Sequence, residues 1–393
     1  MKNNILIFIG SYLPGTKSAG VTTSIKNLID NLYGDFNFYI ITADRDIGDI
    51  KQYDNVVIDK WVRYENCNIF YSSNYKKSII EFKNIINSIE FDTYYFNGFY
   101  NYVDIARALP LYTMKLIPNK PIIIAPRGIF SMGEYKNKQL FRSIYRAIFK
   151  LFRFDKKVYW HATGIEEKEH ITKFFPKSNN RIYNISDLAK VFNIKEDKVP
   201  NLTKEKGSVK IIFISRISEK KNIKFILETL NKVNGNIILD IYGMIGTEAD
   251  KKYWDECKLI INNLNKNITV NYLGELESDM VGEAFRKYHI FFFPTFGENY
   301  GHVIAESIIN GCPVLLSDTT PWNSLSKYNA GWIYPLSDEI EYINKLQEII
   351  DMDNADWNLL HNGAINASKA LINNDVVINE YKKFFWECIE ENS

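Results

Sequence analysis

The chain alternates short apolar runs with amphipathic segments along its whole length. Short apolar runs without polar interruption predict buried strands, and apolar residues repeating every three to four positions predict helices. In the first half, strands are expected at 5–9, 36–42, 93–96, 121–125 and 158–162. Helices are expected near 21–33, 75–89, 101–115, 136–154 and 165–175.

The second half repeats this alternation. Strands are expected at 209–215, 236–242, 268–273, 290–294 and 313–317. Helices are expected near 222–233, 249–264, 279–287 and 302–310, with a last helix at 376–391. Alternating buried strands and helices predict α/β domains with parallel sheets, here two Rossmann-like domains joined at the polar segment 196–208. Ligands bind such sheets at the carboxyl ends of the strands, so a cleft between the domains is the expected site.

One stretch of the second half, Phe293 to Asp318, carries two glutamates on a strand–turn–helix–strand pattern. Glu298 falls in the Gly-rich turn near the helix start, and Gly301 closes that turn. Glu306 is expected about two turns further on. Gly311 occupies the position where a helix commonly ends. Backbone amides at a helix start suit a diphosphate, and ionised carboxylates suit sugar hydroxyls, so the spacing fits a sugar–diphosphate–ribose ligand.

A second motif, ISRISEKKN, follows the strand at 209–215. It places Arg216 and Lys221 five residues apart, just past the strand end, where fixed cations can pair with a diphosphate. Lys220 is the neighbouring alternative, and an ordinary solvated loop is the other interpretation.

These two motifs together resemble the donor site of retaining GT-B glycosyltransferases of the glycosyltransferase family 4 type. The resemblance implies that Glu298 contacts the donor sugar, Glu306 holds the nucleotide ribose, and Arg216 and Lys221 stabilise the leaving diphosphate. The register before Asn222 favours Lys221 over Lys220. The alternative is a buried βαβ unit with two incidental glutamates.

Further donor contacts are expected at Gly243, after the strand 236–242, and at Asn299, Tyr300, Gly301 and His302, around the start of the helix 302–310. For His302 the alternative is packing against a neighbouring helix. In the first half, the loop 10–24 lacks the GxGxxG fingerprint. Gly20 in that loop is expected to approach the donor phosphate or the acceptor, and an ordinary βα turn is the alternative.

The segment 122–134 departs from the family pattern. Many members place a histidine after this strand, whereas here Arg127 stands between Pro126 and Gly128. Arg127 is expected to bind a donor or acceptor phosphate, and it cannot act as a base because guanidinium stays protonated. His161, after the next strand, is either a core histidine or a substrate contact.

The amino-acid composition argues against several kinds of binding partner and site. The 393 residues include 46% hydrophobic and 24% charged residues, typical of a globular protein, and a net charge of +1 gives no pull toward nucleic acid. Four cysteines without paired spacing favour neither disulfides nor zinc, and we expect no transmembrane segment and no signal peptide. The Asp-x-Asp pair in 43–46 could hold a metal, but we interpret it as a turn and expect no metal and no cofactor.

The segment 136–157 is dense in Lys and Arg, with apolar residues between them at helical spacing. Such a helix can lie on an anionic bilayer surface. The alternative is a surface helix whose apolar side packs on the core.

The resemblance implies three parts: an acceptor-binding domain (1–200), a nucleotide-sugar-binding domain (201–375), and a C-terminal helix (376–393) that crosses back to the first domain. It implies a retaining transfer in surface polysaccharide synthesis, from a UDP-sugar in preference to a GDP-sugar, to a glycan or polyprenyl-diphosphate-linked acceptor. The expected location is cytoplasmic or peripheral on the inner face of the cell membrane. The alternatives are a GT-B-fold nucleotide-sugar epimerase and a non-catalytic partner subunit.

Overall fold

The structure is a computed structural model, and it divides the chain into two compact units. Unit 1 consists of Met1–Val191 and Asn374–Ser393, and unit 2 of Phe192–Asn373. The structure describes residues 2–15, 17, 19–73, 78–100, 104–130, 139–190, 202–372 and 374–391. The first part of the predicted linker 196–208, with the expected boundary after residue 200, lies outside the described residues.

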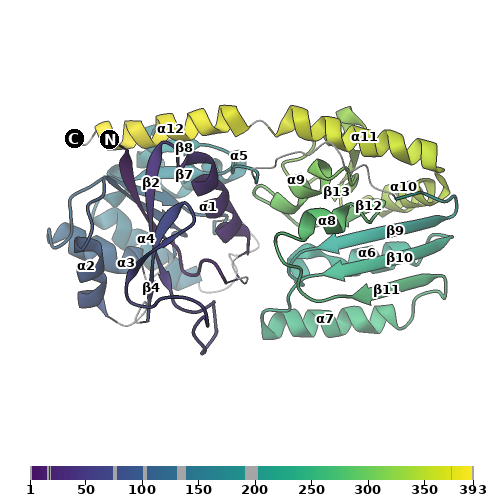
Figure 1. The fold of residues 1–393 in the computed structure, drawn as a ribbon, viewed down its shortest axis with the longest axis horizontal. Coiled ribbons are helices and arrows are strands. Elements are labelled where there is room, and N and C mark those ends of the chain that lie inside the picture. Colours follow the sequence, from purple (N-terminus) through teal and green to yellow (C-terminus); the bar gives the residue numbers. More distant parts are fainter. Residues whose placement is uncertain are drawn as a thin grey trace. The chain divides into compact units, whose positions relative to one another are not determined.

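Unit 1 is built on one mostly parallel sheet. In its described part the strand order is β3-β4-β2-β1-β5-β6-β7-β8, and only the β3–β4 pair is antiparallel (Figure 1). The strands are β1 (Asn3–Phe8), β2 (Phe36–Ala43), β3 (Trp61–Tyr64), β4 (Cys67–Ser72), β5 (Thr93–Asn97), β6 (Ile122–Ala125), β7 (Tyr159–Ala162) and β8 (Ile182–Asn184).

Both faces of this sheet are buried, which explains its continuous apolar strands. Side chains alternate between the two faces of a strand. Ile5 and Ile7 accordingly belong to one apolar cluster, and Leu6 and Phe8 to another.

Helices cover the two faces of the unit 1 sheet. They are α1 (Ala19–Leu32), α2 (Ile79–Asn87), α3 (Ile105–Thr113), α4 (Gln139–Leu151), α5 (Ile165–Phe174) and α12 (Asn374–Glu390), with short 3-10 turns η2 (Phe154–Lys156) and η3 (Pro176–Arg181). Figure 1 shows α12, in yellow, lying along unit 1. Phe385 of α12 meets Phe36 edge-on with ring centroids 5.4 Å apart, and Lys382 pairs with Asp35 at 2.8 Å. The C-terminal helix therefore returns to the first domain, as predicted.

Unit 2 contains a second sheet, and every strand pair in its described part is parallel. The strand order is β11-β10-β9-β12-β13-β14. The strands are β9 (Ser208–Ile214), β10 (Asn236–Tyr242), β11 (Ile268–Tyr272), β12 (Ile290–Phe293), β13 (Val314–Ser317) and β14 (Gly331–Tyr334). The helices are α6 (Ile223–Leu230), α7 (Glu248–Ile261), α8 (Val281–Phe285), α9 (His302–Ile309), α10 (Glu339–Asp351) and α11 (Asn354–Leu371), with 3-10 turns η4 (Glu219–Lys221) and η5 (Leu325–Tyr328).

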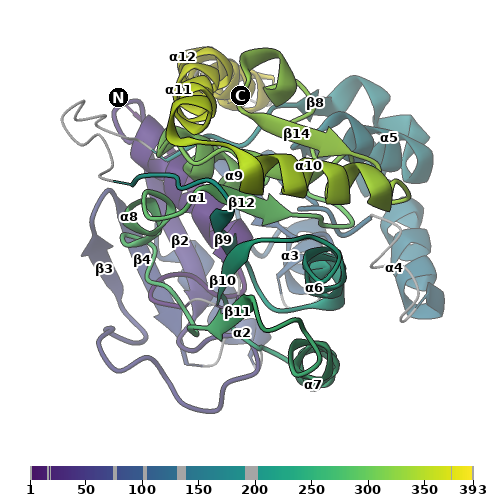
Figure 2. The same cartoon turned by 90° about the vertical axis from the view of Figure 1, so that its right-hand side faces the viewer.

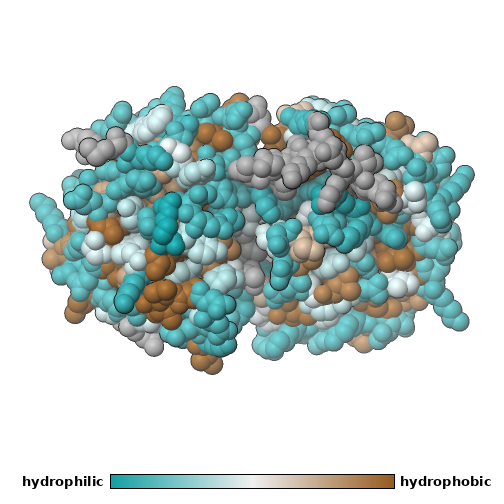
Figure 3. Space-filling view, viewed as in Figure 1, coloured by the Kyte–Doolittle hydropathy of each residue, from teal (hydrophilic) through white to brown (hydrophobic). Residues whose placement is uncertain are grey.

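The two-domain α/β prediction with parallel sheets is confirmed. In the view of Figure 3, hydrophilic residues cover most of the surface of each unit, with apolar patches between them. Within the described ranges, no helix is both long enough and apolar enough to cross a membrane.

Candidate functional site

Main-chain hydrogen bonds connect three loops of unit 2, which follow the neighbouring strands β9, β12 and β13 at their carboxyl ends. The amide of Phe296, after β12, donates a hydrogen bond to the carbonyl of Lys220 at 2.9 Å. The amide of Glu298 donates to the carbonyl of Thr319, after β13, at 3.3 Å. The main chain thus holds the glutamate loop against both neighbouring loops.

Thr295 reinforces this arrangement, and the sequence analysis did not identify it. Its side chain donates to the carbonyl of Lys220 at 3.1 Å. Its carbonyl accepts hydrogen bonds from the hydroxyls of Ser317 at 2.5 Å and Thr319 at 2.7 Å. The sequence contains a signal for this role, because Thr295 and Thr319 follow the apolar strands β12 and β13. The ends of parallel strands are where the polar side chains of a site are expected.

Lys221 and Glu298 form an ion pair at this sheet edge. Their side chains are only 15% and 16% exposed, so the pair is largely withdrawn from water. The Lys221 ammonium also lies 5.2 Å from the ring centroid of Phe293, the last residue of β12. The structure therefore brings together one residue from each of the two predicted motifs.

The charge state of Lys221 is set by opposing effects. Burial lowers the pKa of Lys221, the carboxylate of Glu298 raises it, and the positive charges of Lys220 and Arg216 lower it further. An ammonium in these surroundings is stabilised by a nearby anion. A diphosphate arriving here would meet a cation that already has an anionic partner.

Arg216 lies two residues past β9, on the same loop as Lys221, and its side chain is exposed. This loop runs close to the backbone of Gly243: a Cβ built at Gly243 would stand 1.8 Å from the carbonyl oxygen of Ser215. Gly243 also has a φ of 151°, which L side chains rarely adopt. Glycine at this position therefore allows the Ser215–Arg216 segment to take its observed path.

The start of α9 has a left-handed residue and an aromatic pair. Gly301 precedes the helix with a φ of 78°. The carbonyl of Tyr300 accepts a hydrogen bond from the indole of Trp322 at 2.5 Å. The ring of Tyr300 lies with its centroid 4.9 Å from that of His302, the first residue of α9. Asn299 is exposed beside them.

Glu306 lies nearer the helix start than the sequence analysis places it. Because α9 begins at His302, Glu306 is about one turn into the helix rather than two. His302 and Glu306 are four residues apart and so share one face of α9. Glu298 lies in the turn before the helix.

Gly20 is not in the loop before α1, because this helix already begins at Ala19. Among the described residues, a Cβ at Gly20 would meet no atom within 4 Å, so their packing does not require glycine there. The sequence analysis places this residue before the helix, and that boundary is wrong by two positions. Its assignment to the donor or acceptor stays a prediction.

Arg127 lies in a largely buried polar network of unit 1, with its side chain 6% exposed. Its guanidinium donates to the carboxylate of Asp187 at 2.8 Å, to the amide oxygen of Asn97 at 2.9 Å and to the hydroxyl of Tyr95 at 3.0 Å. The hydroxyl of Ser24, on α1, donates to the other oxygen of Asp187 at 2.7 Å. The observed contacts of Arg127 are thus within the protein, and its expected role with phosphate stays a prediction.

His161 is a core histidine in this structure. It is fully buried, with Tyr95 at 2.7 Å from Nδ1 and Tyr381 of α12 at 3.2 Å from Nε2. Burial and, to a smaller extent, the positive charge of Arg127 lower the pKa of His161 to about 4. A neutral imidazole therefore links the sheet of unit 1 to its C-terminal helix.

The carboxylates of the Asp-x-Asp pair serve the turn that contains them. Asp44 pairs with Arg45 at 2.7 Å, and Asp46 accepts hydrogen bonds from the amides of Lys17 and Ile47. Both aspartates are buried. Across the described ranges, no cluster of three His, Cys, Asp or Glu residues could hold a metal ion.

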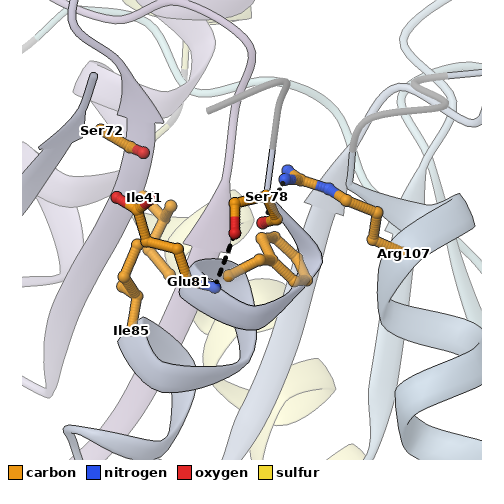
Figure 4. A pocket seen from close by; sticks show the side chains of 7 residues that line it. Ile41, Ser72, Ser78, Glu81, Ile85 and Arg107 are labelled. Atoms are coloured by element: carbon orange, nitrogen blue, oxygen red, sulfur yellow. Dashed lines mark hydrogen bonds between the residues drawn. The ribbon is translucent and has the colours of Figure 1, made fainter. Parts of the chain in front are cut away.

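A small pocket lies elsewhere in unit 1, among β2, β4, α2 and α3 (Figure 4). Ser78 caps α2 there by accepting a hydrogen bond from the amide of Glu81 at 3.1 Å, and the Arg107 guanidinium donates to the Ser78 carbonyl at 3.4 Å. The pocket contains none of the residues assigned to the donor, and we interpret it as a packing feature.

Comparison with known proteins bears on both parts of the chain. Residues 194–369 match the family described as Glycosyl transferases group 1. None of the curated proteins matches the sequence.

Solved structures match the chain over nearly its whole length. Sucrose-phosphate synthase from Thermosynechococcus elongatus has a TM-score of 0.74 at 13% identity, covering 99% of this chain and 100% of the other. HepE from Anabaena, in complex with UDP and glucose, has a TM-score of 0.69 at 12% identity, covering 98% and 100%. The trehalose-6-phosphate structure from E. coli, bound with UDP-2-fluoro glucose, has a TM-score of 0.69 at 9% identity, covering 98% and 99%.

At these identities the structures establish the fold alone. The chain has the GT-B fold, and its residues 194–369, less than half of its length, match the family described as Glycosyl transferases group 1.

Proposed function

We propose that the protein is a retaining glycosyltransferase that uses a nucleotide-diphosphate sugar. The observation that carries this proposal is the Lys221–Glu298 pair, largely buried at the strand ends of the unit that contains the family match. A cation held in this position can pair with a diphosphate. A carboxylate beside it can accept hydrogen bonds from sugar hydroxyls.

In the proposed reaction, the bond between the anomeric carbon and the diphosphate oxygen breaks through an oxocarbenium-like transition state. Arg216 and Lys221 stabilise the charge that grows on the diphosphate, and this interaction strengthens as the bond breaks. Glu298 positions the sugar and Glu306 holds the ribose. The acceptor hydroxyl attacks on the face that the diphosphate leaves, and its proton passes to the diphosphate, as in the family that the chain resembles.

For the donor, we propose a UDP-sugar. The neighbouring structures support this choice: HepE was solved with UDP and glucose, and the E. coli structure with UDP-2-fluoro glucose, whereas a starch synthase from Arabidopsis thaliana was solved with ADP and acarbose. For the acceptor, we propose a glycan or a polyprenyl-diphosphate-linked glycan of surface polysaccharide synthesis. WaaG, described as involved in lipopolysaccharide biosynthesis, matches 93% of this chain with a TM-score of 0.64.

We propose a cytoplasmic location for this reaction. None of the four cysteines, all of which lie in described parts of the chain, forms a disulfide. Reduced thiols fit a reducing compartment.

A thermal-shift screen against nucleotide sugars tests the proposal. A donor at about 100 times its dissociation constant adds about 2.7 kcal/mol to the free energy of unfolding. We expect a UDP-sugar to raise the unfolding temperature of the wild type, and to raise it less in Lys221→Ala. The stabilising donor is then incubated with the protein alone, where an epimerised sugar would indicate an isomerase. If no nucleotide sugar stabilises the protein, the proposal is wrong.

A further inference from the structure

Helix α4 of unit 1 exposes apolar side chains that an ordinary surface helix would turn toward the core. Six large apolar side chains of α4 and the residue after it are between 49% and 77% exposed: Leu140, Phe141, Ile144, Ile148, Leu151 and Phe152. A surface helix normally turns such a stripe toward the core. The alternative of a surface helix whose apolar side packs on the core therefore holds for Phe149 and Tyr145, and not for these six side chains.

The basic side chains of α4 lie against the protein instead. Arg142 stacks 5.0 Å from the ring centroid of Tyr100, and Arg146 stacks 4.6 Å from that of Phe174. The Lys150 ammonium lies 5.5 Å from the ring centroid of Phe175. These three positions repeat at four-residue intervals and so define one face of the helix. Cation–π contacts of this kind hold the basic face of α4 on the aromatic core.

The opposite face forms a continuous apolar strip. Residues three and four apart share a helix face, which aligns Leu140, Ile144, Ile148 and Leu151. This strip is roughly 17 Å long, since each helical residue adds about 1.5 Å. Figure 2 shows α4 at the outer edge of unit 1, below α5. Contiguous apolar surface of this kind marks an interaction site.

The exposed charges of the segment 139–157 have one sign. From residue 139 to residue 157, every exposed charged side chain is basic: Lys150, Arg153, Lys156 and Lys157. The only acidic residue of this segment, Asp155, is 4% exposed. Lys177 on η3, a turn that contacts η2, is also exposed and basic.

We propose that the apolar strip of α4 inserts into the interface of an anionic lipid bilayer, with Arg153, Lys156, Lys157 and Lys177 on the headgroups. An apolar face flanked by lysine and arginine is the pattern of helices that lie in a membrane surface. A second copy of the chain fits less well, because a symmetric contact would bring the basic residues of both copies together. The proposal goes beyond the sugar-transfer chemistry and does not depend on it.

The strip is tested by co-sedimentation of the full chain with vesicles of phosphatidylglycerol and phosphatidylcholine, or of phosphatidylcholine alone. We expect the wild type to bind the anionic vesicles and not the zwitterionic ones. Ile144→Glu combined with Ile148→Glu should lower the partition coefficient at least ~10-fold, because charged side chains oppose insertion of the face. Leu259→Glu combined with Leu359→Glu, at exposed helix positions of unit 2, is the matched control and should bind as the wild type does.

The basic border is tested separately. Changing Arg153, Lys156 and Lys157 to glutamine should lower binding at least ~10-fold at low ionic strength, since each basic residue near an anionic surface contributes to binding. Arg142, Arg146 and Lys150 are unsuitable for this purpose, because they pack on aromatic rings and their loss would disturb α4 itself.

A conservative variant reports insertion directly. The native cysteines are buried, so Ile148→Cys can be labelled with an environment-sensitive fluorophore. The proposal expects a blue shift of its emission with anionic vesicles. It is overturned if the wild type does not bind them, if Ile144→Glu with Ile148→Glu binds as the wild type does, or if the label does not shift. A wild-type dimer in light scattering that becomes monomeric in that double variant would also overturn it, in favour of a second copy.

Discussion

Lys221 and Glu298 are each other's partners at the strand ends of unit 2, although 77 positions separate them in the chain. From the sequence, Lys221 is expected to contact the diphosphate of the donor and Glu298 its sugar. Under the proposed function, donor binding would exchange one anionic partner of Lys221 for another. Removing Glu298 would then leave the Lys221 side chain available to a diphosphate.

The first prediction concerns the two cations of the β9 loop. Arg216→Ala and Lys221→Ala should each lower the turnover number at least ~100-fold, by analogy with the loss of one group that stabilises transition-state charge. The measurement is the initial rate of sugar transfer at saturating donor. Lys220→Ala is the matched control, because Lys220 is exposed and the variant keeps the carbonyl that accepts the hydrogen bond from the Phe296 amide. Near-normal turnover in Arg216→Ala and Lys221→Ala would remove both side chains from the proposed mechanism.

The second prediction concerns the pH dependence of nucleotide binding. The pKa of Lys221 is lowered by burial and raised by Glu298. A diphosphate needs the protonated amine, so nucleotide affinity should fall as pH rises through this lowered pKa. Glu298→Gln removes the effect that raises the pKa, so in that variant the fall should begin at lower pH than in the wild type.

Calorimetric titration with the nucleotide diphosphate over a series of pH values measures this shift. In Lys221→Met, this alkaline fall in affinity should disappear. Superimposable pH profiles for the wild type and Glu298→Gln would show that the ion pair does not control the charge of Lys221.

The third prediction concerns Gly243. In Gly243→Ala the new Cβ would stand 1.8 Å from the carbonyl oxygen of Ser215, so the segment that carries Arg216 must shift. Turnover should fall at least ~10-fold, since a small misplacement of a catalytic group costs rate steeply. Gly274→Ala is the control, because Gly274 also has a positive φ, of 74°, but has open space at its Cβ. Equal losses of turnover in both variants would point to backbone strain rather than to displacement of Arg216.

Much of the fold could be predicted from the sequence because parallel strands buried on both faces are apolar without interruption. β1, β12 and β13 are examples, and their predicted bounds lie within two residues of the observed ones. β3 and β14 were missed because they are short and only partly buried, at four residues each. β4 was missed because Asn68 interrupts its apolar run.

Helices α10 and α11 could have been found. In α10 the buried residues Tyr342, Leu346, Ile349 and Ile350 recur at helical spacing, a signal that the sequence analysis left unassigned. The contacts of the site could not be predicted in this way. The Lys221–Glu298 pair and the cross-links of Thr295 join loops that are distant in sequence, so they follow only from the strand order β9-β12-β13.

The fourth prediction concerns the stability of unit 1 in acid. The pKa of His161 falls from its ordinary 6.5 to about 4 in the folded chain. Between these values the unfolded chain binds the proton and the folded chain does not, so stability falls as pH decreases through this range. A pKa difference of this size corresponds to about 3 kcal/mol of unfolding free energy.

Denaturant unfolding of the wild type and His161→Gln over this pH range measures the effect. The variant should lose less stability on acidification, whereas His289, whose pKa burial also lowers to about 4, contributes equally to both proteins. If the two stability curves run parallel over this pH range, His161 does not take up a proton on unfolding, and the prediction is wrong.

The last prediction separates the two glutamates. Glu306 is expected to hold the ribose, so Glu306→Ala should weaken binding of the free nucleotide diphosphate and of the whole donor alike. Glu298 is expected to contact only the sugar, and it is also the anion that neutralises Lys221. Glu298→Ala should therefore keep or strengthen nucleotide affinity at a pH below the lowered pKa of Lys221, where the amine is protonated. Its turnover should nevertheless fall, because a misplaced sugar loses its near-attack geometry.

Calorimetric titration of both variants with the nucleotide diphosphate and with the full donor tests these roles. The positions of the residues support the distinction, since Glu298 lies in the turn before α9 and Glu306 lies about one turn into it. If Glu298→Ala loses nucleotide affinity as strongly as Glu306→Ala does, Glu298 is a nucleotide ligand and the assigned roles are wrong. If Glu306→Ala binds the nucleotide as the wild type does, the ribose is held elsewhere, and His302, on the same helix face, becomes the residue to test.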